Sequence, residues 1–156
     1  MKIEFKDNTY IVYLNKYNVI DMDFSDTESL ERYLKKLLLR LKKHYKIDIK
    51  GYYNIIVYMD EYYGAVLKIE EDNDYYDFFD DTIAIRMKKV KSKFLYEVDD
   101  VSYVDKYIDK FKISINDNII YLTINNELNE YEYLNLLEMS NIIYDRKLWL
   151  SINFVL

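Results

Sequence analysis

Hydrophobic and polar residues alternate with a period of two over much of the chain, which is typical of β-strands. Residues 2–6 and 9–14 show this alternation, and the two residues between them predict a tight hairpin turn. A second hairpin is predicted from residues 53–59 and 65–70, which are joined by DEYYG. In this hairpin, one buried face is expected to contain Ile55, Val57, Met59, Ala65, Leu67 and Ile69.

A different period, close to that of an α-helix, separates the two hairpins and predicts a long helix. Ser25 and Glu28 have the spacing of a capping box and indicate its start, and its end is expected between Ile47 and Gly51. Leucines and tyrosines at helical spacing form an apolar face that would pack on a sheet. This face consists of Leu30, Tyr33, Leu34, Leu37, Leu38, Leu41 and Tyr45.

The second half of the chain repeats this mixture of strands and helices. Strands are predicted over residues 82–90, 93–98, 112–116, 119–125 and 147–155, and helices over 101–110 and 127–144. From residue 93 the order is β-α-β-β-α-β, which is the ferredoxin-like order of elements. We therefore predict an α+β protein with two small hairpin-helix-hairpin lobes, the second with ferredoxin-like order. One continuous α+β domain is the alternative.

The predicted boundary between the lobes is the acidic and aromatic stretch EEDNDYYDFFDD, residues 70–81. It implies an N-terminal lobe over residues 1–70, a connector over 71–81 and a C-terminal lobe over 82–156. The stretch contains seven carboxylates, four aromatic rings and no base. It fails as a calcium-binding loop, because Tyr76 stands where a third ligand is needed and no glycine allows the sharp turn. We predict no metal site and no cofactor.

Composition excludes several classes of enzyme. The chain has no cysteine, and its one histidine, His44, lies in KKHYK, so a Cys/His dyad or a multi-histidine zinc site cannot form. With two glycines and no proline, the sequence contains no phosphate-binding loop and no nucleophile elbow. Carboxylate pairs could still perform acid-base chemistry, but nothing in the sequence selects a pair. We therefore predict a protein that is not an enzyme.

Length and residue usage indicate where such a protein occurs. With 156 residues, 51% of them apolar, the chain can bury a core. It shows neither the apolar run of a signal peptide nor the roughly 20 apolar residues that span a bilayer, which predicts a cytoplasmic protein. Ile, Lys, Asn and Tyr total 69 residues, whereas Ala, Gly, Pro and Arg total 8. This bias indicates an AT-rich genome, such as that of a low-GC bacterium or its phage.

The predicted long helix is basic in an acidic chain. Residues 32–50 carry eight bases and one acid, a net charge of +7, which leaves −13 on the remaining chain. The plain interpretation is a solvated helix face, and the functional one is a docking face for an acidic protein segment. Direct binding of nucleic acid is disfavoured, because one helix offers few phosphate contacts. The candidate docking face consists of Arg32, Lys35, Lys36, Leu39, Lys43 and Lys46.

The acidic and aromatic stretch is a second candidate for partner binding. The plain interpretation is a hydrated connector, and the functional one uses aromatic rings as anchors and carboxylates for steering. The candidate residues are Asp72, Asp74, Tyr75, Tyr76, Asp77, Phe78, Phe79, Asp80 and Asp81. This stretch could also pair with the basic helix, through exposed contacts that contribute little individually. Exposed strand edges are a third means of binding.

Several stretches resemble the MecA-type adaptor proteins of low-GC bacteria. The opening MKIEFKDNTYIVYL resembles the first hairpin of that family, and residues 94–108, 118–124 and 136–143 resemble its C-terminal lobe in order and spacing. The matching positions in the opening are Ile3, Glu4, Asn8, Thr9 and Val12. The resemblance implies a non-enzymatic adaptor that delivers substrates to a Clp-type AAA+ unfoldase. The N-terminal lobe would grip the substrate, and the C-terminal lobe would engage the unfoldase.

The leading hypothesis is a cytoplasmic α+β protein that works by protein-protein interaction, with a MecA-like adaptor as its most specific form. The alternative is a small acidic phage-encoded inhibitor that blocks a nucleic-acid site on a host or CRISPR effector enzyme. An enzyme that uses Asp/Glu pairs alone is a third, weaker option. The expected partner is therefore a protein, either a Clp-type ATPase or a nucleic-acid enzyme, and not a membrane.

Overall fold

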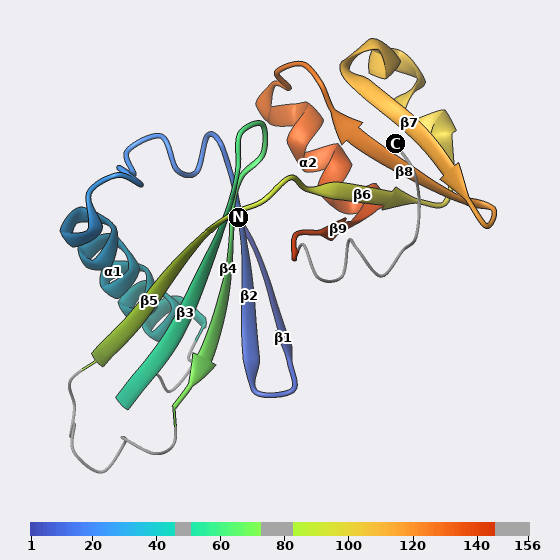
Figure 1. Cartoon of the computed structure of the whole chain (residues 1–156). Coiled ribbons are helices and arrows are strands. Elements are labelled where there is room, and N and C mark those ends of the chain that lie inside the picture. Colours follow the sequence, from blue (N-terminus) through green and yellow to red (C-terminus); the bar gives the residue numbers. More distant parts are fainter. Residues whose placement is uncertain (46–50, 73–82, 146–156) are drawn as a thin grey trace.

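The computed structural model of the protein describes residues 1–45, 51–72 and 83–145 (Figure 1). These residues form an α+β fold with one mixed sheet of five strands and one antiparallel sheet of four. In spatial order, the first sheet contains β1 (Lys2–Lys6), β2 (Thr9–Asn15), β4 (Gly64–Glu71), β3 (Gly51–Asp60) and β5 (Ile83–Lys91). The second contains β7 (Phe111–Asn116), β8 (Ile119–Ile124), β6 (Leu95–Val98) and β9 (Ser140–Ile143).

Two hairpins build most of the first sheet. β1 and β2 are joined by Asp7 and Asn8, whose φ angles of 52° and 61° are tolerated by Asp and Asn at little cost. β3 and β4 pair antiparallel, with Ile55 opposite Ile69, and their shared face is buried. Both predicted hairpins are confirmed. Of the buried face predicted for the second hairpin, Met59 is half-buried and the other five residues are buried. Alternation fixes the register here, because a slip of one residue would turn every buried side chain to solvent.

Helix α1 (Thr27–Tyr45) covers one face of the first sheet (Figure 1). Its predicted apolar face is confirmed for the five leucines, which are all buried, while Tyr33 is half-buried. The predicted capping box is wrong. Asp26 caps the helix instead, because its Oδ1 accepts from the backbone N–H of Glu28 at 3.1 Å, and Ser25 donates its hydroxyl to Asp23.

Strand β5 belongs to the first sheet, where it pairs parallel to β3 from Ile83 opposite Gly51 to Lys91 opposite Met59. The predicted C-terminal lobe, residues 82–156, includes this strand, whereas its pairing is with a strand of the first sheet. Ile85 and Met87 are half-buried against the core beneath α1, and this packing helps to stabilise the edge strand on the sheet. The chain therefore passes from one sheet to the other between β5 and β6. The predicted division into lobes at residues 71–81 stays a prediction.

The second sheet carries two helical elements, the 3₁₀ helix η2 (Val101–Lys110) and helix α2 (Glu130–Met139). The order along the chain from β6 is strand, helix, strand, strand, helix, strand, and its last strand, β9 (Ser140–Ile143), lies within the helix predicted over 127–144. The helix predicted over 127–144 is too long at both ends. It starts after Asn129, which forms a capping box with Glu132, and it ends at Met139. The strand predicted over 147–155 lies outside the described residues.

Residues Ser140–Ile143 form strand β9 and not the last turn of a helix. Ile142 and Ile143 are β-branched and pair with Tyr96 and Leu95 of β6. The gain from pairing with a buried central strand exceeds the helical preference of the preceding leucines. No helix in the described part of the chain is long and apolar enough to cross a membrane.

Two hydrophobic clusters form the core. One lies between α1 and the first sheet, and the other includes residues of both sheets. In the second cluster Tyr63, which follows β3, packs its ring 5.7 Å from those of Phe94 and Tyr133. The two sheets therefore share buried aromatic surface, which contributes to holding them together.

Candidate interaction surface

The basic stripe predicted on α1 lies on the outer face of the helix, opposite the buried leucines. Arg32, Lys36 and Lys43 are exposed, and Lys35 is half-buried with its Nζ 3.6 Å from a Glu31 carboxylate oxygen. Leu39 lies within the stripe and is 54% exposed, so an apolar side chain is presented to solvent among bases. Lys46 is outside the described residues. The helical period predicted this face, and four of its five described residues are exposed, Lys35 being half-buried.

Strand β5 adds four more bases beside this helix. Arg86, Lys88, Lys89 and Lys91 are all exposed, and the Lys89 Nζ donates to the carbonyl of Phe24 at 3.0 Å. Among the described strands, β5 is the one that α1 approaches most closely (Figure 1). The sequence analysis missed these residues. The run RMKKVK was visible in the sequence, but its position beside α1 depends on the parallel pairing with β3.

The two elements together form a basic surface that continues around the β5 edge of the first sheet, with Lys89 and Lys91 on the face towards α1 and Arg86 and Lys88 on the opposite face. From Arg32 to the end of α1 the sequence contains six bases and no acid, and β5 contains four bases and no acid. The chain has a net charge of −6, so these ten bases leave −16 on the rest. Like charges held this close raise the local positive potential, which attracts an anionic partner. The basic surface consists of Arg32, Lys35, Lys36, Arg40, Lys42, Lys43, Arg86, Lys88, Lys89 and Lys91.

The predicted acidic and aromatic site is described only at its first residue. Asp72 follows the end of β4, where its backbone N–H donates to the Tyr52 carbonyl at 2.8 Å and its carboxylate accepts from the Asn54 side chain at 3.3 Å. This carboxylate therefore helps to end the β3–β4 ladder. The other candidates, from Asp74 to Asp81, lie outside the described residues, so their role in binding stays a prediction.

The lone histidine and the metal-ligating side chains can be placed in the described part of the chain. His44 is exposed in the last turn of α1. Within residues 1–45, 51–72 and 83–145, no group of three or more His, Cys, Asp or Glu side chains is arranged to hold a metal ion. The acidic loop considered for calcium falls mostly outside these ranges.

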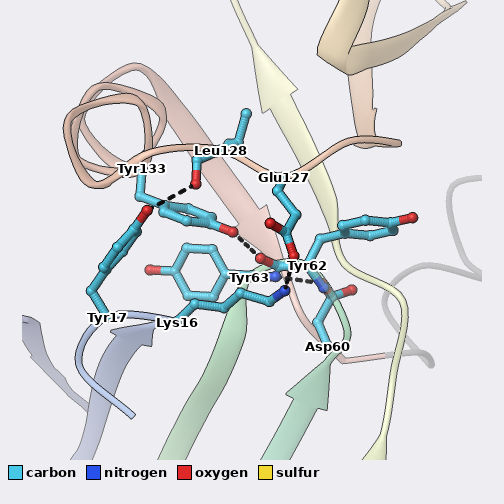
Figure 2. Close-up of polar contacts among 8 residues, drawn as sticks. All are labelled: Lys16, Tyr17, Asp60, Tyr62, Tyr63, Glu127, Leu128 and Tyr133. Atoms are coloured by element: carbon cyan, nitrogen blue, oxygen red, sulfur yellow. Dashed lines mark hydrogen bonds and ion pairs between the residues drawn. The ribbon is translucent and has the colours of Figure 1, made fainter. Parts of the chain in front are cut away.

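A group of polar contacts lies where the two sheets meet (Figure 2). Asp60, at the end of β3, holds this junction through its carboxylate. Its Oδ1 accepts from the backbone N–H groups of Tyr62 and Tyr63 at 2.8 Å each, and its Oδ2 accepts from that of Phe94 at 2.8 Å. The Tyr133 hydroxyl of α2 donates to the Tyr62 carbonyl. One carboxylate therefore orders the β3–β4 turn and connects it to the start of the second sheet.

The loop after β2 makes further polar contacts across the junction (Figure 2). The Lys16 Nζ lies 3.4 Å from the Glu127 Oε1, and the Tyr17 hydroxyl donates to the Leu128 carbonyl at 3.4 Å. The Lys16 Nζ also lies 5.9 Å from the ring centre of Tyr62. Glu127 is largely exposed, so its ion pair with Lys16 contributes little stability.

Two cavities flank Asp60. One of about 580 Å³ is lined by Val19, Phe24 and Met59 among others, and one of about 350 Å³ is lined by Ser92 and Tyr96 among others. Two of their polar groups have structural partners: Asp60 accepts three backbone N–H groups, and the Ser92 hydroxyl donates to the Tyr144 carbonyl at 2.7 Å. These two side chains therefore serve to hold the junction together.

Replacement of Asp60 by alanine is expected to destabilise the protein by about 3 kcal/mol, because three backbone N–H groups lose a charged acceptor. Urea unfolding followed by circular dichroism measures the loss. Glu61→Ala is the matched control, since Glu61 is the exposed acidic neighbour. Equal stability of the two variants would contradict the structural role of Asp60.

Comparison with protein-family models, with curated proteins and with solved structures finds no match to this chain. The function is therefore argued from the surface itself.

Proposed function

We propose that this chain is a non-enzymatic protein-interaction protein that binds an acidic segment of a partner protein through the basic surface of α1 and β5. The observation that carries the proposal is the gathering of ten bases on two adjacent elements of an acidic chain, namely β5 and the part of α1 from Arg32 onward, which together contain no acid. Such a concentration of like charge costs folding energy through repulsion, which an anionic partner relieves on binding.

A short acidic protein segment fits this surface better than nucleic acid does. The charge of −16 on the rest of the chain repels a long polyanion, whereas a short segment can contact the basic surface alone. Leu39, which is 54% exposed within the stripe, offers an apolar contact that a phosphate backbone does not need. Charges would steer the partner, and apolar contacts near the centre would add affinity.

An adaptor that delivers substrates to a Clp-type unfoldase is the most specific form of this proposal. It draws on the MecA-type resemblance of the opening hairpin and of the second half. The finer fold description, two hairpin-helix-hairpin lobes of which the second is ferredoxin-like, belongs to the same proposal. The order β7-β8-β6-β9, with each neighbouring pair antiparallel, supports that second part.

A binding measurement tests the basic surface directly. The probe is a fluorescent peptide about as long as β5 in which glutamate and valine alternate, with glutamine replacing glutamate in the control peptide. We expect the acidic peptide to bind and the glutamine control peptide not to bind. The affinity of the acidic peptide should fall with added salt. Changing Arg32, Lys36 and Lys43 together to glutamine should weaken binding roughly tenfold.

The control variant changes Lys2, Lys6 and Lys112 to glutamine, which alters the net charge equally at exposed lysines elsewhere. Equal weakening of binding by both variants would show that the peptide does not bind specifically at the basic surface. Recovery of a Clp ATPase on the immobilised chain would support the adaptor form. Recovery of a nucleic-acid enzyme, unaffected by the basic-surface variant, would favour the acidic inhibitor instead.

A further inference from the structure

We propose that the acidic partner segment binds as an added β-strand along the outer edge of β5, with its carboxylates beside the bases of that strand. This inference rests on the proposed function and adds the mode of binding. β5 stands last in the order β1-β2-β4-β3-β5, and in the described residues it pairs with β3 alone. Its outer backbone N–H and C=O groups therefore form a template for another strand.

The other strand edges suit an acidic segment less well. β5 is nine residues long, whereas β1 has five, β7 six and β9 four. All charged side chains of β5 are basic. β1 contains Glu4, whose carboxylate lies 3.2 Å from the Lys2 Nζ, so that edge is already neutralised in part. Length and charge both select β5.

The bases of β5 lie on both faces of the sheet, as the alternation of a strand requires. Lys89 and Lys91 share a face with Ile85 and Met87, which pack towards α1, whereas Arg86 and Lys88 alternate with them and belong to the other face. Side chains directly opposite on neighbouring strands lie about 5 Å apart. The carboxylates of an added strand therefore lie beside bases of β5 on whichever face of the sheet they occupy. Carboxylates on the face towards α1 also lie on the same side of the sheet as the bases of the helix.

Protection against aggregation is the plain explanation for lysines on an edge strand. It explains β5 but not α1, whose bases contribute nothing to a sheet edge. The same charges also exclude a second copy of this chain as the occupant, because two β5 edges would place bases against bases. An acidic strand meets opposite charge along the same edge. The basic edge therefore selects its partner as well as preventing self-association.

N-methylation of the peptide tests strand addition. An added strand bonds the edge through the N–H groups of one alternate set of residues, and a free peptide can present either set. Methylation of both sets therefore blocks pairing, whereas methylation of one set leaves the other edge of the peptide able to pair. With the alternating glutamate-valine peptide, we expect methylation of both sets to weaken binding at least tenfold and methylation of either set alone to change it about twofold or less. Hydrogen exchange should show new protection of alternate amides in β5.

The variant Lys88→Gln/Lys91→Gln should also weaken binding at least tenfold, and Lys6→Gln/Lys112→Gln, on two other edge strands, should leave it nearly unchanged. If the peptide methylated on both sets binds as well as the unmodified peptide, strand addition is wrong while the proposed function stands. If the unmodified acidic peptide does not bind, the proposed function fails as well. Displacement of the peptide by a single-stranded oligonucleotide of equal length at equal concentration would overturn both in favour of a nucleic-acid site.

Discussion

Gly64→Ala is expected to destabilise the protein by on the order of 3–5 kcal/mol, a large share of the roughly 5–15 kcal/mol that keeps a domain folded. Gly64 starts β4 with a φ of +128°, a conformation that residues with a side chain rarely adopt. A Cβ atom here would lie 2.5 Å from the Leu14 carbonyl oxygen and 2.8 Å from the Asn15 carbonyl carbon. Both are backbone atoms of β2, so relief of the clash requires the strand itself to move.

The pairing around Gly64 leaves little room for that movement. Gly64 lies opposite Asn15 of β2 and opposite Asp60 of β3, so a shift would disturb both neighbours of the central strand β4. Urea unfolding of the variant should show a much lower midpoint, with Glu61→Ala in the same turn changing stability by less than about 1 kcal/mol. A Gly64→Ala variant as stable as the wild type would show that the backbones do not approach this closely.

Local elements of the fold were predictable because their patterns are short in range. The register of Ile55 opposite Ile69 follows from alternation and a short turn, and the leucines of α1 follow from the helical period. The boundary at Met139 was not predictable in this way. The residues after it continue a helical pattern, and only the long-range pairing with β6 decides that they form a strand.

The residues that cap the two helices were also not predictable from sequence spacing alone. Ser25 and Glu28 match the capping-box spacing, but Asp26 is one residue closer to the helix and its carboxylate is a stronger acceptor. At the other helix Asn129 and Glu132 form a capping box that was hidden inside a helix predicted to start too early. Several polar residues near a helix start compete, and geometry decides between them.

Half of the basic surface could be found from the sequence. The stripe on α1 was predicted because a helix fixes which of its own residues share a face, as Lys36 and Leu39 do. The half on β5 could not be predicted, because strand β5 reaches α1 only through parallel pairing with β3 across a crossover. Parallel partners are distant in sequence, and alternation within a strand does not identify its neighbour.

Raising the pH above 10 is expected to unfold the protein cooperatively. Burial raises the pKa of Tyr58 to about 12, and it raises the pKa values of Tyr63, Tyr96 and Tyr133 above the ordinary value of 10. Burial and the nearby Glu4 carboxylate do the same to the pKa of Tyr13. These rings lie in the cluster that joins the two sheets, so a phenolate in the folded state would be charged within the shared core.

The direction of the pH effect follows from proton binding. Below pH 10 these tyrosines are neutral in both the folded and the unfolded state, and their contribution to stability is complete. Above pH 10 the unfolded chain releases their protons and the folded protein keeps them, so each tyrosine lowers the free energy of unfolding by about 1.4 kcal/mol per pH unit. Several such tyrosines together would remove a free energy of unfolding of about 5–15 kcal/mol within roughly two or three pH units.

Circular dichroism and phenolate absorbance, recorded together during an alkaline titration, measure this effect. We expect the phenolate signal of the buried rings to rise in the same step in which secondary structure is lost. Tyr96→Phe should move this step to higher pH without loss of stability at neutral pH, because the buried Tyr96 hydroxyl makes no hydrogen bond in the described part of the chain. Tyr131→Phe, which removes a side chain that is 71% exposed, is the control. Full phenolate formation with secondary structure intact would show that these rings are not buried as described.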